Sequence, residues 1–354
     1  MQEKKFDYKR EADRLLSHRS VRLIGAFHKF MGMKKAMSLY RPEHLSAMSE
    51  VAILQLLNKY VLYNSLNLSF PRIKELVIEG KPPRNEAEAS VTRYARALTL
   101  INEGYFTHKD ILADIITLNN VLLYDTLESN RCQWRFHDKL SFLYPSKDGY
   151  TPKIPPADSI KSLVSAMCAD YTAVIREGEI DPLLIIPVFV MDMQIIQPFD
   201  RGTMEMYWLI TYYLMNWAGY NISDIISIVH YITRNKLEDC HIYPAVLDGW
   251  EKGTNDYHEA FFYWKEGLWE SCSQFEELAE LLSAPYTNAD LVLKVIKFYK
   301  EKITKRVIMS YLPNIGEASV ELALNTLKKQ GRIKMISGGR YAEYVYVGPS
   351  TDCL

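Results

Sequence analysis

Apolar residues recur at helical spacing along most of the chain, from residue 8 to about residue 285. Between His44 and Ser65, apolar or aromatic side chains follow a period close to that of an α-helix. The same period returns between Glu86 and Glu103 and again over 108–124 and 159–176. The pattern therefore predicts an all-α body.

Two of the expected helices are apolar on nearly all sides. The first runs from Leu183 to Gln194 and the second from Thr203 to Trp217, with Thr203 as a plausible N-cap. Helices of this kind lie in the centre of a core. Pro187 should kink the first helix or delay its start. The short polar loop between the helices then places several polar side chains and a helix N-terminus at the edge of the core.

Two other segments have a different pattern. Gln133 to Tyr144 is aromatic and partly alternating, which predicts a short hairpin or flap. From residue 288 three helices precede two alternating segments that flank Gly338-Gly339. That order is typical of a winged helix-turn-helix. We therefore expect an N-terminal helical region over 1–100 that packs on the core, a core over 101–285 and a winged helix over 288–354.

Composition narrows the class of protein. The chain has 354 residues, is 48% hydrophobic and has a formal net charge of -1, so a wholly basic, nucleic-acid-coating surface is excluded. Residues 288–354 nevertheless carry 11 Lys and Arg against 6 Asp and Glu, which leaves the helical body acidic. The five cysteines are scattered, which disfavours disulfides or a zinc site and favours the cytoplasm. The longest apolar run is too short to span a membrane, so we expect a soluble protein.

In their order and spacing these elements resemble the Fic (filamentation-induced-by-cAMP) domain proteins. Asn85 to Leu98 resembles the helix before the Fic core, and the aromatic segment with Arg135, followed by Pro155-Pro156, resembles the target-docking flap. Ile196 to Gly202 falls where that family has its signature loop. A C-terminal winged helix is also common in the family. The resemblance implies an all-α Fic-like core with a short β-hairpin flap and an appended winged helix.

The family's loop reads His-Pro-Phe-x-Asp/Glu-Gly-Asn-Gly-Arg-x-x-Arg, and the resemblance implies a role for each position. The His is the base that takes a proton from a target hydroxyl. The acid holds the metal on the nucleotide phosphates, and the glycine-rich turn with the next helix N-terminus cradles phosphate oxygens. The arginines neutralise the charge that develops during AMP transfer.

This sequence departs from the family at nearly every chemical position of the loop. Pro198, Phe199 and Gly202 are retained. The changed positions, in chain order from the base to the second arginine, are Gln197, Arg201, Thr203, Met204, Glu205 and Trp208. Shifting the alignment by one residue places Asp200 at the position of the acid, but the base and the arginines are still missing. We therefore expect no catalytic residue, no metal and no cofactor, unless an enzyme of altered chemistry uses ATP or another nucleotide with Mg²⁺.

The inhibitory motif of many family members is also altered. Its glutamate pairs with the second arginine, and the corresponding position here is Asn67. Ile78-Glu79-Gly80 also matches part of that motif but lies too close to the helix at Asn85, so Asn67 is favoured.

The remaining candidates concern binding. Gln197 fits a structural plug of the loop, and Arg201, Gly202 and Thr203 form a candidate site for a small anion. Protein or peptide docking at the flap would use Arg135, Phe136 and His137. The candidate DNA contacts of the winged helix are Lys328, Lys329, Arg332 and Arg340. The alternatives for that unit are protein docking or a homodimer.

Three functions follow from these observations. The first is a Fic-like binding or regulatory module without AMP transfer. The second is a nucleotidyltransferase-like enzyme of altered chemistry, and the third is a DNA-binding transcriptional regulator.

Overall fold

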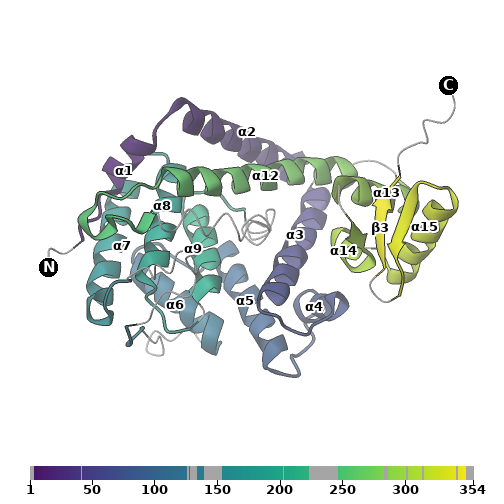
Figure 1. Cartoon of the computed structure of the whole chain (residues 1–354), viewed down its shortest axis with the longest axis horizontal. Coiled ribbons are helices and arrows are strands. Elements are labelled where there is room, and N and C mark those ends of the chain that lie inside the picture. The colour runs from purple at the N-terminus through teal and green to yellow at the C-terminus, as the bar shows by residue number, and fades with distance from the viewer. Residues whose placement is uncertain are drawn as a thin grey trace.

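The computed structural model describes residues 4–40, 42–125, 127, 134–138, 154–201, 203–222, 246–282, 286–299, 302–312, 315–339 and 342–347. These segments are mostly helical, so the predicted all-α body is confirmed (Figure 1). The helices of the body are α1 (Tyr8–Leu15), α2 (His18–Tyr40), α3 (Pro42–Tyr63), α4 (Phe70–Val77), α5 (Glu86–Asn102), α6 (Ile111–Tyr124), α7 (Ile160–Glu177), α8 (Pro182–Ile196), α9 (Thr203–Trp217) and α12 (His258–Leu282). Short 3-10 turns lie at Ala157–Ser159 and Trp250–Lys252.

Side-chain caps fix where several of these helices begin. The Asn85 side chain accepts a hydrogen bond from the amide of Glu88 at 2.9 Å and starts α5. Asp110 does the same for α6 through the amide of Ala113 at 3.1 Å. A cap of this kind stabilises a helix by roughly 1 kcal/mol because it satisfies an amide that has no partner within the helix.

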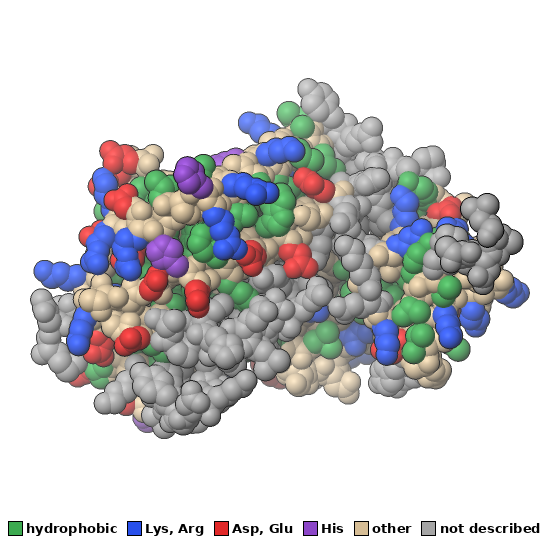
Figure 2. All heavy atoms as spheres, turned by 45° about the horizontal axis from the view of Figure 1, so that its top comes forward, with side chains coloured by type: hydrophobic (Ala, Val, Ile, Leu, Met, Phe, Trp, Pro, Cys, Tyr) green, Lys and Arg blue, Asp and Glu red, His purple; other side chains and the backbone are tan. Residues whose placement is uncertain are grey.

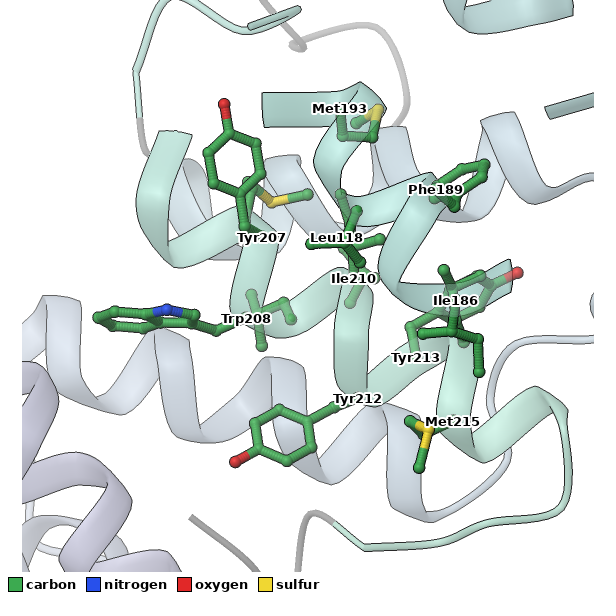
Figure 3. Packing of buried hydrophobic residues seen from close by; sticks show 14 of the residues in the cluster. Leu118, Ile186, Phe189, Met193, Tyr207, Trp208, Ile210, Tyr212, Tyr213 and Met215 are labelled. Carbon is green, nitrogen blue, oxygen red and sulfur yellow. The ribbon is translucent and has the colours of Figure 1, made fainter. Parts of the chain in front are cut away.

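Helices α8 and α9 form the centre of the body, as their all-round apolar pattern predicts. Helices α1, α7, α9 and α12 all pack against α8, and α5 and α6 pack against α9. Figure 3 shows the side chains of α8 and α9 meeting there, with Leu118 of α6 between them. One continuous core extends from Tyr8 to Cys272, so the N-terminal helices share it with the region after residue 100.

The long helix α12 connects the body to the C-terminal unit. It lies along α2 and α3, packs on α8 and reaches α13 (Figure 1). Among the described residues no helix is both long and apolar enough to cross a membrane.

The C-terminal unit has its own core, with the three expected helices before a pair of strands and one strand, β1, that the sequence did not predict. It consists of α13 (Asn288–Tyr299), β1 (Ile303–Thr304), α14 (Lys305–Tyr311), α15 (Glu317–Lys329), β2 (Ile333–Ser337) and β3 (Glu343–Tyr346). The three strands are antiparallel in the order β1-β3-β2, so β3 is central. Helix α14 docks this unit on α3, where Arg306 donates to the Asn58 Oδ1 atom at 2.8 Å and to the Leu68 carbonyl at 2.9 Å.

Candidate functional site

The polar loop between α8 and α9 begins at a sharp turn. Asp181 caps α8 by accepting from the Leu183 amide at 2.8 Å, and the helix then runs without interruption from Pro182 through Pro187 to Ile196. The delayed start considered for this helix is therefore wrong, because the Asp181 cap and Pro182 already fix its first turn. Gln197 ends the helix with a φ of 47°, a left-handed conformation that a residue with a side chain rarely adopts.

Arg135 holds this turn in place from the flap segment. Trp134 forms an antiparallel bridge with Phe199, and the Arg135 amide donates to the Pro198 carbonyl at 2.8 Å. The guanidinium group donates to four further carbonyls, those of Ile196, Gln197, Pro155 and His137, at 2.7–3.1 Å. These bonds commit the whole guanidinium group to backbone oxygens within the chain.

The described part of the flap differs from the expected docking surface in one respect. Arg135 is only 2% exposed, so its role is to fix the loop and not to face a target. Phe136, by contrast, is 66% exposed, and its ring centroid lies 3.8 Å from that of the exposed His137. The rest of the expected hairpin over 133–144 lies outside the described residues.

The expected anion site is only partly described. Arg201 is exposed, Gly202 lies outside the described residues, and α9 begins at Thr203, whose side chain is not among those described. Acidic groups surround the loop. Arg93 pairs with Glu86 and lowers the pKa of that carboxyl, and the positive charge of Arg201 lowers it further. The charge of Arg201 is therefore partly offset by a carboxylate on α5.

Glu205 adds a second negative charge on the first turn of α9. Burial raises the pKa of Tyr60 on α3, and the Glu205 carboxylate raises it further. Where the resembled family has an arginine to meet phosphate, this chain thus presents a carboxylate to α3 and α5.

Trp208 fills the position of the second arginine with a buried aromatic ring. It is 3% exposed, and its ring lies 5.1 Å from that of Tyr63 on α3 in an edge-to-face arrangement. In Figure 3, Trp208 points away from Ile186 and Phe189 of α8. Asn67, expected opposite this position, lies exposed in the link between α3 and α4. The residue of α3 that contacts Trp208 is Tyr63, four positions earlier.

The charge at Arg201 bears on whether the loop could hold a metal ion. At the position of the family's metal-binding acid stands the cationic Arg201, which repels Mg²⁺. Within the described ranges, no three His, Cys, Asp or Glu side chains gather in a way that could hold a metal ion.

Two buried ionisable groups were not identified from the sequence. Asp192, on α8 near the loop, is 1% exposed and accepts hydrogen bonds from the Tyr8 hydroxyl at 2.8 Å, the Trp250 indole at 2.7 Å and the Tyr257 hydroxyl. Burial raises the pKa of Asp192. The second group is Lys265 on α12, which is 3% exposed. In the sequence, Asp192 directly follows an apolar run and Lys265 interrupts one, and this pattern could have identified both as buried charges.

The predicted DNA contacts lie at the end of α15 and just after it. Lys328, Lys329 and Arg332 are exposed, whereas Arg340 lies outside the described residues. The first turns of the same helix carry exposed Glu317 and Glu321.

Comparisons with known proteins give a result for the fold alone. No protein-family description and no characterised protein sequence matches the chain. A Fic domain containing signaling protein from Bacteroides thetaiotaomicron VPI-5482 aligns in structure with a TM-score of 0.57 and 15% identity, over 71% of this chain and 94% of that one. A Fic family protein from Desulfovibrio desulfuricans G20 aligns with a TM-score of 0.48 and 14% identity, over 94% of this chain and 97% of that one. The chain therefore has a Fic-like fold.

Proposed function

We propose that this chain is a degenerate member of the Fic family that binds a partner or ligand and does not transfer AMP. The observation on which the proposal rests is the buried Trp208. An arginine that contacts phosphate must reach into an open pocket, whereas Trp208 packs against Tyr63 of α3 and is 3% exposed. The place of a phosphate-binding cation is thus occupied by the hydrophobic core.

The other loop positions support the same conclusion. A glutamine side chain does not take up a proton at neutral pH, so Gln197 cannot serve as general base. Glu205 would repel a nucleotide triphosphate, because like charges about 4 Å apart interact unfavourably by roughly 4 kcal/mol near a protein surface. Base, metal ligand and phosphate-binding groups are all replaced, and no single replacement would restore the family's reaction.

The binding role is supported by what remains exposed beside the loop. Phe136 presents an apolar ring next to a turn that Arg135 holds rigid, which suits the docking of a protein or peptide segment. The exposed Arg201 suits a small anion better than a triphosphate, because its charge already acts on the Glu86 carboxylate and the first turn of α9 carries the negative Glu205. We also propose that the C-terminal unit is a winged helix, which the order of its elements and its β1-β3-β2 sheet support.

Incubation with labelled ATP, and separately with other labelled nucleotides, in Mg²⁺ or Mn²⁺ tests the proposal. We expect no label on the protein or on added proteins. The variant Gln197→His should remain inactive, because the metal and phosphate groups are still missing. Label transfer by the unchanged protein would refute the proposal and favour an enzyme of altered chemistry.

The binding role needs its own measurement. Titration with inorganic phosphate should show weak binding that is independent of Mg²⁺ and is lost in Arg201→Ala. If phosphate binds equally well to Arg201→Ala, the anion part of the proposal is wrong, whatever the outcome with nucleotides.

A further inference from the structure

The outward side of α15 exposes a large apolar side chain. Leu322 is 70% exposed, the highest value for any large apolar residue in the described part of the chain. The residues of α15 that enter the core of the C-terminal unit are Val320, Ala323, Leu324 and Leu327. Leu322 lies on the opposite side of the helix. Covering this leucine in an interface would contribute roughly 1.5–3 kcal/mol to association.

Leu322 belongs to a stripe with the spacing of a helix-packing surface. Ala318, Leu322, Asn325 and Lys329 follow one another at intervals of four, three and four residues, and all but Leu322 are small, polar or long and flexible. Such a stripe faces one direction along a helix, so a second helix that packs along it contacts Leu322 near the middle and the other three side chains on either side.

The charges beside the stripe change sign along α15. At its start, Glu317 and Glu321 share the single cation Lys305, with N–O distances of 2.6 and 2.5 Å, and both carboxylates stay about half exposed. That end retains one negative charge. The last turn carries the two exposed lysines Lys328 and Lys329. The helix is therefore negative at its start and positive at its end.

We infer that this side of α15 pairs with the same side of a second copy of the chain, with the two helices antiparallel. A twofold axis near the middle of the stripe would place the negative start of each helix against the positive end of the other. Both Leu322 side chains would be covered at once. A surface that is complementary to itself is what a two-fold interface requires.

The same side of the helix is less suited to DNA. Glu317 and Glu321 would approach phosphates at the end of the helix that normally enters the major groove. On the face that Figure 2 shows, hydrophobic and basic side chains of the C-terminal unit lie next to each other. Because one pair of helices buries less than the roughly 800 Å² per partner of a standard interface, we expect a weak, concentration-dependent dimer.

Sedimentation equilibrium of the full chain from about 1 to about 500 µM tests the apolar contact. We expect a monomer–dimer equilibrium, and Leu322→Glu should weaken dimerisation at least about tenfold. Leu39→Glu is the matched control, because Leu39 is 69% exposed on α2. This control should dimerise like the unchanged protein, and thermal melting should show that both variants are folded.

Charge reversal tests whether the opposite charges at the two ends of α15 hold the copies together, whatever the exact register. Glu317→Lys/Glu321→Lys makes the helix positive at both ends, and Lys328→Glu/Lys329→Glu makes it negative at both ends. Each double variant alone should be monomeric, whereas an equimolar mixture should form a heterodimer. A monomeric unchanged protein over the whole range, or an unaffected Leu322→Glu dimer, would overturn the inference. The inference of a dimer is also refuted if the unchanged protein stays monomeric and binds duplex DNA through Lys328 and Lys329.

Discussion

Lys265 offers the sharpest test of how this fold handles a buried charge. The Lys265 amine lies 5.3 Å from the ring centre of Phe261 and 5.8 Å from that of Trp264, and it has no hydrogen-bond partner among the described residues. Burial lowers the pKa of Lys265 from its ordinary value of 10.5 to about 7, although the charge of Asp181 acts in the opposite direction. The folded protein therefore holds this amine largely uncharged above neutral pH.

The direction of the pH effect follows from proton binding. Between pH 7 and pH 10.5 the unfolded chain binds more protons at Lys265 than the folded chain does, so the free energy of unfolding rises with pH across this window. Each pH unit between the two pKa values corresponds to 1.36 kcal/mol. Burying this amine therefore lowers the free energy of unfolding by about 5 kcal/mol well below pH 7 and by about 4 kcal/mol at pH 7.

The perturbation is Lys265→Met, which keeps an unbranched side chain against Phe261 and Trp264 but removes the amine. We expect the free energy of unfolding at pH 7 to rise by about 3–5 kcal/mol, and the gain to shrink towards zero near pH 10. Urea denaturation at several pH values measures both quantities from the shift in midpoint. The control Lys161→Met, at an exposed position of α7, should change stability by less than about 0.5 kcal/mol.

A result in which Lys265→Met gains nothing at pH 7, or gains equally at pH 7 and pH 10, would refute this reasoning. The first outcome would mean that the amine is hydrated in the folded protein. The second would mean that the gain comes from packing and not from the removed charge.

Three further predictions concern the loop and the C-terminal unit. Arg135→Met should lower the free energy of unfolding by about 3–5 kcal/mol in urea denaturation, because buried carbonyls lose their donor; an effect below about 1 kcal/mol would contradict the role assigned to Arg135. Trp208→Ala should cost about 3–5 kcal/mol by the same assay and leave nucleotide transfer absent, since it opens a cavity beside Tyr63 and supplies no cation. Arg306→Met should speed amide exchange in α14 more than in α8, because only α14 loses its bond to Asn58. Amide exchange in α14 that is as slow as in the unchanged protein would contradict this prediction.

The sequence predicted the framework because the framework depends on local pattern. The all-round apolar composition of α8 and α9 is visible within each segment, and so is the order of three helices and a strand pair after residue 288, although the two-residue strand β1 was missed. The start of α8 did not follow from local pattern, because a proline in the sixth helical position predicts a kink or a later start. The Asp181 cap and the core around α8 outweigh the hydrogen bond that Pro187 cannot make.

The interactions of the loop could not be predicted in the same way. Arg135 resembles a surface residue in sequence, but its partners lie 61 and 62 residues away at Ile196 and Gln197. The contact between Trp208 and Tyr63 is equally invisible in the sequence, because nothing near Trp208 indicates which residue of α3 faces it. Long-range partners become known only when the packing of whole helices is known.

The distance in sequence between packed elements has a consequence for how this chain reaches its native state. Tyr8 bonds to Asp192 across 184 positions, α2 and α3 pack against α12, and Arg306 reaches back 248 positions to Asn58. A ribosome-bound chain has made α1, α2 and α3 long before α12 exists. The sides of α2 and α3 that pack on α12 stay uncovered throughout that interval, although α3 can already pack on α2, α4 and α5, and contacts of such high sequence separation form slowly. Synthesis of this protein therefore passes through a stage at which part of the apolar surface of its first sixty residues is still waiting for the helix that covers it.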